Sequence, residues 1–557
     1  MKSRTSFFNL TALRKDITRF APVWALYLIG GLLVGLTTLS GSDYMRHESV
    51  RALASSIGAL TVVNLVYAII NAELLFGDLF NSRLCNALHA FPLRRESWFA
   101  THTVAGLLFS FVPNLILSIC FLPMMGELWY ISFLWLLGVT LTYVFFFALA
   151  AFSAMCTGNR FAMAAVYTII NFASMIVYWF VATFYEPLLT GLHIRESSFS
   201  RLCPAVWAAD LELVEFTYKR FNTTEILVDS FGNNRYYDSK YVFQGLTHNW
   251  WYLAIIAVIG VALLGAALLL YRRRKLESAG DFVAFSWLKP IFSVVFTLCM
   301  GAAFELFADL FIRVDYVFLA VGIVVGYFVG QMLLQRTVRV FRKRTFANCI
   351  AIGALLVISI CLTAIDPLGV TRWTPKPEKV ESITLSSNYY YQPEWDYKVN
   401  NAQVITTPAL IEDLVEIHGL LIEEEWSNVY GSNAVHLTYK MSDGRQIVRR
   451  YYYHTNAIES RLNKFFSSPE FVLGYEDWED YLATVDYLYV ADQKYTGTKA
   501  IELLTAIKKD CEAGTMTQSY AQSPYRDLNI YTKDGDIVYI QINRNCKNAI
   551  AWFKENE

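Results

Sequence analysis

Long apolar runs alternate with short polar connections over the first 365 residues of the chain. Nine runs reach the length of about 20 residues that a helix needs to cross the hydrocarbon core of a bilayer, which is roughly 30 Å thick. They cover residues 20–39, 54–75, 101–124, 129–153, 161–185, 250–271, 290–310, 316–335 and 346–365. The pattern predicts a polytopic α-helical membrane protein with about nine transmembrane helices.

Beyond about residue 371 the hydrophobic period changes from long runs to alternation, which is typical of strands in a soluble domain. We predict a strand, a helix, a hairpin at Asp443-Gly444 and a second helix, followed by the same order with a hairpin at Asp534-Gly535. The expected ranges are 380–391, 408–425, 434–453 and 458–466, then 485–490, 498–512, 528–542 and 548–554. Residues 366–557 are therefore interpreted as a C-terminal α+β soluble domain with two tandem β-α-β-β-α repeats.

The rest of the chain divides into three parts. Residues 1–19 precede the first apolar run and lack the small-residue cleavage site of a signal peptide, so we expect the first span to be retained. Residues 20–275 hold six spans, with a long aromatic loop at 186–249 between the fifth and the sixth. Residues 276–365 add three further spans.

Charge predicts the orientation of these spans. Only 17% of the residues are charged, whereas 16% are aromatic, which suits a membrane protein with aromatic residues at its interfaces. With the N-terminus inside, the inner segments hold 19 Lys and Arg residues and the short outer segments hold 3. The positive-inside rule then predicts a cytoplasmic N-terminus, and an odd number of spans predicts an extracellular C-terminal domain.

The split of net charge agrees with that topology. Residues 366–557 carry a net charge of −9 and residues 1–365 carry +8. An acidic soluble domain can also lie on the inner side, and one span too many or too few reverses the prediction. Cys511 and Cys546 could form a disulfide in an extracellular domain, but two cysteines do not establish one.

Catalytic and nucleotide-binding signatures are absent from the sequence. It has no G-x-x-x-x-G-K-[ST] loop, no H-E-x-x-H and no paired aspartate motif. His418, His436 and His454 lack the spacing of metal ligands. We therefore predict a protein that is not an enzyme, holds no cofactor or metal of its own and does not bind nucleic acid.

The connection between the second and third runs is the most specific local feature. It holds a short polar helix followed by a proline and a basic pair, and its candidate contact residues are Asn81, Arg83, His89, Phe91, Pro92, Leu93, Arg94 and Arg95. Such a segment can dock a partner protein. It can equally be a plain basic anchor that keeps the loop in the cytoplasm.

Ionisable residues inside spans are costly and are therefore functional candidates. Glu305 and Asp309 lie four residues apart in the seventh run and share a helix face. Glu73 and His102 lie near the inner ends of the second and third runs. The alternative for these side chains is that they reach hydrated positions at the membrane interface.

Two of these segments resemble the permease subunits of ABC-2-type transporters, which are bacterial exporters with a separate ATPase. Phe91, Pro92, Leu93 and Arg95 match the hydrophobic-Pro-hydrophobic-x-Arg stretch that such permeases have before their third span. The stretch Tyr271-Arg272-Arg273-Arg274-Lys275-Leu276-Glu277-Ser278-Ala279-Gly280 is similar to the end of their six-span core. Residues 1–19, with Phe7, Phe8, Leu10, Leu13 and Ile17, resemble their amphipathic interface helix.

The resemblance covers residues 1–280, and some Gram-positive permeases also carry extra spans and a C-terminal extracellular domain. It implies a permease subunit in a bacterial cell membrane that exports a peptide, a lipid or a drug. It also implies a homodimer, or a heterodimer with a related permease, driven by partner ATPase subunits that hold ATP and Mg²⁺. The loop at residues 81–95 would be the coupling helix.

Two other classes of function are compatible with a membrane protein of this pattern. The first is a membrane sensor whose extracellular domain binds a ligand and signals through the spans. The second is a membrane-embedded enzyme, which the absence of catalytic motifs disfavours. An adjacent gene for a Walker-loop ATPase would favour transport, and an adjacent kinase gene would favour sensing.

Overall fold

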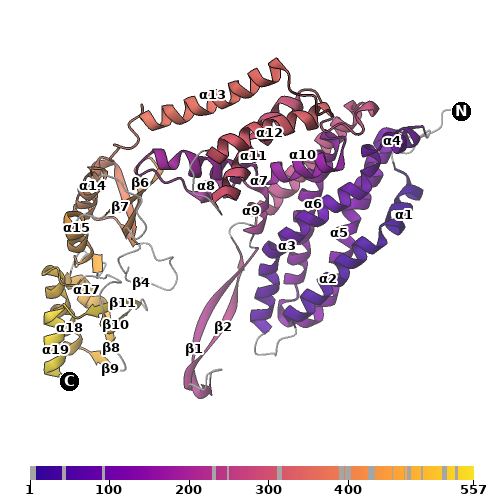
Figure 1. The fold of residues 1–557 in the computed structure, drawn as a ribbon. Coiled ribbons are helices and arrows are strands. Elements are labelled where there is room, and N and C mark those ends of the chain that lie inside the picture. The colour runs from indigo at the N-terminus through magenta and orange to yellow at the C-terminus, as the bar shows by residue number, and fades with distance from the viewer. Residues whose placement is uncertain are drawn as a thin grey trace. The chain divides into compact units, whose positions relative to one another are not determined.

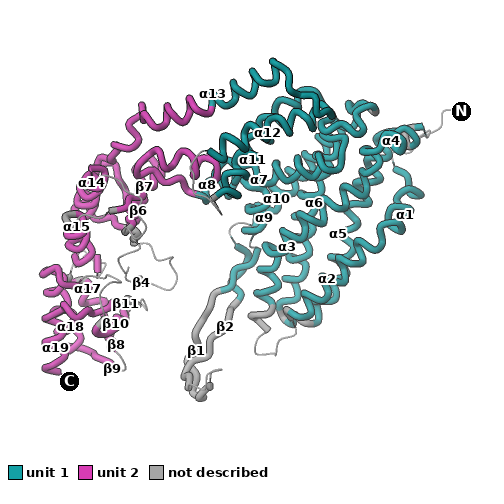
Figure 2. The backbone as a smooth tube through the Cα atoms, in the orientation of Figure 1, with its two compact units in different colours: residues 1–178, 196–355 teal, residues 179–195, 356–557 magenta. Residues whose placement is uncertain are grey.

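The computed structural model describes most of the chain. The described residues are 8–39, 46–90, 94–211, 213–228, 234–247, 250–309, 317–387, 394–395, 403–423, 433–453, 456–468, 471–472, 478–490, 493–516, 524–533 and 537–556. They form two compact units (Figure 2). Unit 1 comprises residues 1–178 and 196–355, and unit 2 comprises residues 179–195 and 356–557.

Unit 1 consists of helices and one long hairpin (Figure 1). Its helices are α1 (Leu10–Arg19), α2 (Ala21–Leu39), α3 (Arg46–Leu75), η2 (Gly77–Phe80), α4 (Ser82–His89), α5 (Arg95–Met125), η3 (Gly126–Leu128), α6 (Ile131–Cys156), α7 (Arg160–Phe184), α8 (Glu196–Ser200), α9 (Pro204–Ala209), α10 (Tyr252–Arg273), η5 (Leu276–Ser278), α11 (Leu288–Asp309), α12 (Val317–Gln335) and α13 (Lys343–Ile365). Strands β1 (Val214–Val228) and β2 (Asn234–Leu246) pair antiparallel within the loop predicted at 186–249.

The long apolar runs are helices. Among the described residues, eight helices are long and apolar enough to cross a membrane, and the number rises to nine if α1 and α2 count as one bent span. These two helices meet at 59° around Phe20. Each of the nine predicted runs corresponds to one helix with bounds shifted by a few residues, which is consistent with a polytopic membrane protein.

Helix α6 lies at the centre of unit 1. It packs against α3, α5 and α10, and an unbroken stretch from Phe145 to Ala151 is buried. A helix that is apolar on all sides is expected to be surrounded by other helices. Small residues such as Ala150 and Ala154 let the neighbouring helices approach closely.

Helices α11 and α12 form a separate tight pair. A Cβ atom at Gly322 would lie 2.8 Å from the Cα atom of Gly301, and one at Gly326 would lie 2.4 Å from the side chain of Met300. Glycines four residues apart let the two helix backbones meet with extensive van der Waals contact, which replaces the hydrophobic driving force that is missing inside a bilayer.

Unit 2 contains two antiparallel sheets and their helices. The strands are β3 (Val380–Ser387), β4 (Glu394–Trp395), β5 (Gln403–Ile405), β6 (Asn433–Met441), β7 (Gln446–Tyr453), β8 (Val485–Val490), β9 (Gln493–Thr496), β10 (Pro524–Thr532) and β11 (Ile537–Asn543). The helices are η4 (Glu186–Leu188), η6 (Pro377–Lys379), α14 (Pro408–Glu423), α15 (Asn456–Phe466), α17 (Trp478–Thr484), α18 (Thr498–Glu512) and α19 (Lys547–Asn556).

The two sheets of unit 2 share one strand order. The first runs β5-β3-β6-β7, and the second runs β9-β8-β10-β11 with β4 added at its end. In both sheets the strand that precedes the longer helix, β3 or β8, pairs with the first strand of the hairpin. The predicted order of strand, helix, hairpin and helix is present in both halves, while the short strands β4, β5 and β9 were not predicted.

Unit 2 also holds the ends of two long helices. The Oγ atom of Ser359 in α13 lies 2.6 Å from the hydroxyl of Tyr185, which directly follows α7. Leu192 forms a β-bridge with Arg449 in the edge strand β7, and the Arg450 N–H donates to the carbonyl of Gly191 at 3.0 Å. The sheet is therefore fastened to the segment that follows α7.

Candidate functional site at the basic end of the helices

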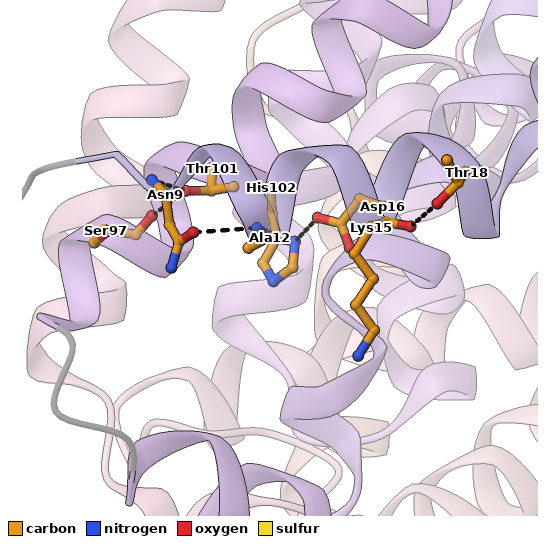
Figure 3. A network of polar contacts seen from close by, with 8 residues as sticks. All are labelled: Asn9, Ala12, Lys15, Asp16, Thr18, Ser97, Thr101 and His102. Atoms are coloured by element: carbon orange, nitrogen blue, oxygen red, sulfur yellow. Dashed lines mark hydrogen bonds and ion pairs between the residues drawn. The ribbon is translucent and has the colours of Figure 1, made fainter.

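Helix α1 is fastened to α5 by two polar contacts (Figure 3). Asn9 caps α1 by accepting hydrogen bonds from the N–H groups of Thr11 and Ala12, and its own N–H donates to Oγ1 of Thr101 at 3.2 Å. Two helical turns on from Asn9, the Asp16 carboxylate lies 2.9 Å from Nδ1 of His102, and both side chains are buried. His102, predicted as an intramembrane candidate, is thus half of a pair that positions α1.

Helix α4 is the predicted short helix between the second and third spans. Oδ1 of Asn81 accepts a hydrogen bond from the Arg83 N–H at 3.0 Å and begins the helix. The thiol of Cys85 is 2% exposed, whereas Arg83 is exposed and Leu84 keeps 50% of its surface in contact with solvent. The helix therefore has one face packed on unit 1 and one face open.

The rest of the predicted docking loop is only partly described. Phe91, Pro92, Leu93 and the side chain of His89 lie outside the described residues. Arg94 is exposed at the N-cap of α5, and Arg95 donates from Nη1 to the carbonyl of Arg274 at 3.3 Å. The basic pair thus divides into one residue on the surface and one that contacts the end of α10.

Arg274 joins three segments beneath α4. Its Nη1 donates to the carbonyl of Ala154 at 2.7 Å, and its Nη2 donates to the carbonyl of Leu79 at 3.0 Å. The carbonyls at the end of α6 have no partner within the helix and carry the negative end of its dipole, so a cation is stabilised there. Burial lowers the pKa of Arg274 to about 10, which leaves the guanidinium charged at neutral pH.

A small void lies under α4 and next to these contacts. Its volume is about 20 Å³, which is room for about one water molecule. Its lining includes Asp78, Cys85, His102 and Tyr271, so it borders the ends of α3, α5 and α10. Burial raises the pKa of the Asp78 carboxyl and of the Cys85 thiol.

The stretch after α10 packs closely against the turn between α6 and α7. The Gly158 N–H donates to the carbonyl of Asp281 at 2.9 Å, and the Gly280 N–H donates to the carbonyl of Gly158 at 2.6 Å. A Cβ atom at Gly158 would lie 2.0 Å from the carbonyl oxygen of Ser278, and Gly280 has φ of +89°. The stretch from Tyr271 to Gly280 is therefore packed into unit 1, and the side chains of Tyr271 and Arg274 are buried.

The remaining intramembrane candidates lie apart from this site or at its edge. Glu73 pairs with Arg160 at 3.6 Å with both side chains partly exposed. The Glu305 carboxylate is buried and accepts a hydrogen bond from the Leu319 N–H at 2.6 Å, in the first turn of α12. The side chain of Asp309 lies outside the described residues. Glu305 thus caps a helix, where its charge is favoured by the helix dipole.

The sequence reasoning missed Arg274, Asp16 and Asp78 as members of this site. Arg274 stood in a run of four basic residues that indicated a cytoplasmic loop and belonged to the stretch similar to the end of the permease core, but no role was assigned to it. Tyr271, Arg274 and Ser278 are three and four residues apart, and all three are buried. Because α10 ends at Arg273 and the backbone of Arg274 is extended, no helical period in the sequence marked this arginine as buried.

Unit 2 contains a second buried polar cluster. The ring nitrogens of His418 lie 2.8 Å from the Tyr451 hydroxyl and 3.0 Å from the Tyr439 hydroxyl, and all three side chains are buried. Burial lowers the pKa of His418 to about 3, with a smaller contribution from the charge of Arg449. The imidazole is therefore neutral at physiological pH.

Arg449 lies next to this cluster and is 3% exposed. Its guanidinium stands over the ring of Trp373 at 5.2 Å. Its Nε and Nη1 atoms are buried and have no hydrogen-bond partner among the described residues. Burial lowers the pKa of this guanidinium.

Metal binding finds no support in the described part of the chain, where no group of three His, Cys, Asp or Glu side chains could hold an ion. His436 stands beside His193 with ring centroids 5.7 Å apart, and His454 lies outside the described residues. Cys511 and Cys546 are both buried free thiols.

Comparison with known proteins adds no relative. No family model matches the chain, and no curated protein or solved structure matches it either.

Proposed function

We propose that the chain is a permease subunit of an ABC-2-type transporter, driven by a separate ATPase that docks on α4. The observation that carries the proposal is the position of α4, which has an exposed face with Arg83 and Leu84 and an opposite face packed on unit 1 through Cys85. The resemblance of residues 1–280 to such permeases and the lack of a nucleotide-binding loop in the sequence support it.

Force on α4 would reach several spans at once. The carbonyl of Leu79, two residues before Asn81, accepts from Arg274, which also holds the end of α6. Arg95 at the start of α5 donates to the backbone of the same arginine, and Arg272 pairs with Glu96 at 3.1 Å. Because these contacts join the ends of α5, α6 and α10, a displaced α4 would move them together as a rigid-body switch.

The proposal places the basic end of unit 1 in the cytoplasm and unit 2 outside the cell. Inner segments with 19 Lys and Arg residues, against 3 in the short outer segments, support this orientation. Four candidate spans follow α7, namely α10 to α13, and an even number returns the chain to the side where α7 ends. The contact between Tyr185 and Ser359 agrees with that parity.

We further propose that unit 2 arose as two tandem β-α-β-β-α repeats. The shared order of strands in its two sheets supports the idea. In an exporter of a peptide, a lipid or a drug, a repeated domain attached to the ends of α7 and α13 could receive the substrate after it has crossed the membrane.

A charge on the open face of α4 tests the docking role. We expect Leu84→Asp to remove a copurifying ATP-hydrolysing subunit and its vanadate-sensitive activity from the chain isolated in mild detergent from its own membranes. The matched control is Val338→Asp, in the loop after α12, where the side chain is 72% exposed. Equal ATPase activity in wild type and Leu84→Asp, or none in wild type, would contradict the proposal.

Labelling in intact cells tests the orientation. We expect an impermeant maleimide to label Ser442→Cys in the β6–β7 turn of unit 2 and to label Arg83→Cys only after lysis, in a background without Cys120 and Cys361, the two exposed cysteines. The reverse pattern would place unit 2 inside the cell.

The sensor alternative rests on a different observation. Unit 2 is fastened to the ends of both α7 and α13, so a ligand that changed its shape would act on two spans. A neighbouring kinase gene, with no ATPase copurifying with the chain, would favour that function over transport.

A further inference from the structure

An apolar groove runs along α2 on the outer surface of unit 1. Its walls come from α2, α3, α5 and α6, and its volume is about 560 Å³. That volume falls within the range of small-molecule sites, about 300–1,000 Å³. It lies within candidate spans, so a bilayer would supply its surroundings.

Glycines on two faces of α2 shape this groove. A Cβ atom at Gly31 would lie 2.5 Å from Leu117 of α5, and one at Gly35 would lie 2.0 Å from Phe121. These two glycines bring α2 against α5. By contrast, a Cβ atom at Gly30 would meet no atom within 4 Å, so the adjoining face of α2 leaves open space.

The polar groups in the groove are already used by the protein. The Tyr27 hydroxyl lies 3.1 Å from Oδ1 of Asn114 and 3.3 Å from Oδ1 of Asn64. Its ring stacks on that of Tyr67 at 4.3 Å, and the Tyr67 hydroxyl donates to the carbonyl of Phe109. The groove therefore presents ring faces and aliphatic side chains, which suit a hydrocarbon chain better than a polar ligand.

The length of the groove matches one lipid tail. Its lining on α2 runs from Val23 to Gly35, which at the helical rise corresponds to about 18 Å. One leaflet is about half of the roughly 30 Å hydrocarbon core. A tail lying parallel to α2 would thus be covered over most of its length.

Basic side chains stand at one end of the groove. Val23 lies one turn beyond Arg19, and α1 also exposes Arg14 and Lys15. The Asp16 carboxylate is buried against His102, so α1 presents three exposed basic side chains against one buried acidic one. An anionic headgroup at the Val23 end would therefore meet net positive charge, which attracts it electrostatically.

We propose that this groove binds one acyl chain of an anionic phospholipid, whose headgroup contacts the exposed basic face of α1. The site does not depend on the transport function proposed above. It would hold a resident lipid in a sensor equally well. A second copy of the chain is the competing occupant.

Photo-crosslinking in vesicles tests the site on the full chain. The probes are phosphatidylglycerol and phosphatidylcholine with a diazirine in one tail, each present as a minor component of phosphatidylcholine vesicles. We expect phosphatidylglycerol to label peptides 23–35 and 60–70 several-fold more than phosphatidylcholine. The proposal would be overturned if phosphatidylglycerol and phosphatidylcholine labelled these peptides equally, and if neither peptide were labelled more than α10.

Two glycines give a matched pair of variants. Gly30→Trp would fill the groove, whereas Gly265→Trp would place the same side chain on α10, where a Cβ atom also meets no atom within 4 Å. We expect at least a fivefold loss of groove labelling in the first and no change in the second. Gly30→Leu serves as a milder substitute if Gly30→Trp is not monodisperse, and retained labelling in the variant that folds would overturn the site.

The headgroup and the competing occupant have tests of their own. Replacing Arg14, Lys15 and Arg19 together by Gln should lower phosphatidylglycerol labelling to the level of phosphatidylcholine. Leu26→Cys, 72% exposed beside the groove, should stay monomeric under oxidation. Rapid disulfide dimers together with an unlabelled groove would assign it to a second copy of the chain and overturn the lipid site.

Discussion

Arg274 in unit 1 and Arg449 in unit 2 are both buried, but their surroundings differ. Arg274 donates to carbonyls of Ala154 and Leu79. Arg449 stands over the ring of Trp373, and its Nε and Nη1 atoms have no partner among the described residues. Burying a charge costs less where hydrogen bonds satisfy its donors than where they are left without partners. Burial alone therefore does not say whether an arginine holds a fold together.

The largest effect should come from Arg274→Met. It leaves two carbonyl groups without their donor, and we expect the free energy of unfolding of unit 1 to fall by about 3 kcal/mol. The buried thiols of Cys85 and Cys156 report the loss, because a thiol-reactive dye reaches them only on unfolding. An unchanged melting curve would mean that this arginine does not join the helix ends.

A smaller loss is expected from Gly191→Ala, at the segment that the edge strand β7 holds. Gly191 has φ of +77°, and a Cβ atom there would lie 2.2 Å from the ring of Tyr451. We expect the free energy of unfolding of unit 2 to fall by about 2 kcal/mol. Faster hydrogen exchange at the Arg450 amide would show it, because that N–H donates to Gly191. Gly419→Ala, inside α14 with no atom within 4 Å, should not destabilise.

Acid should weaken unit 2 through His418. Its pKa is about 3 in the folded state against the ordinary histidine value of 6.5, so the unfolded chain binds more protons between those values. Stability is then fully present above about pH 6.5 and is lost by up to about 1.4 kcal/mol per pH unit as pH falls toward 3.

Hydrogen exchange of the β6 and β7 amides between pH 7 and pH 5 measures this loss. His436, whose pKa burial lowers to about 4, adds a loss of the same sign. His418→Gln should reduce the slope without abolishing it. A slope that His418→Gln leaves unchanged would assign the acid sensitivity to other groups.

The smallest effect is expected from Arg449→Met. The substitution removes a charge with two nitrogen atoms that have no partner among the described residues, and it keeps an unbranched side chain. The free energy of unfolding of unit 2 should therefore change by less than about 1 kcal/mol in either direction. Chemical unfolding of the purified chain measures it. A loss as large as that of Arg274→Met would mean that the guanidinium has partners in solution, and the contrast between the two arginines would fail.

The sequence predicted those parts of the fold that local patterns specify. The long helices followed from apolar runs, and the β6–β7 hairpin followed from Asp443-Gly444 between alternating strands. Strand β5 has only three residues and pairs with β3 across a long connection, so no local period marks it. The bridge between Leu192 and Arg449 joins residues far apart in the chain and could not be predicted.

The candidate site was predicted less completely than the fold. Asn81 and Arg83 lie on or next to α4, and His102 lies at the same end of the helices, but no observation tests their proposed roles. The partners Asp16 and Arg274 were missed because their spacing in the chain gives no hint of contact. Glu305 stood out as a charge within a span, yet its carboxylate meets the backbone at the start of α12.

The contact between the segment after α7 and helix α13 limits how this architecture can be altered. Helices inserted between Phe184 and Lys343 must come in pairs, since a single added crossing would put the partners of the Tyr185–Ser359 contact on opposite faces of the bilayer. Insertions or deletions in that interval should therefore be tolerated when they change the number of crossings by an even number and not when they change it by an odd number.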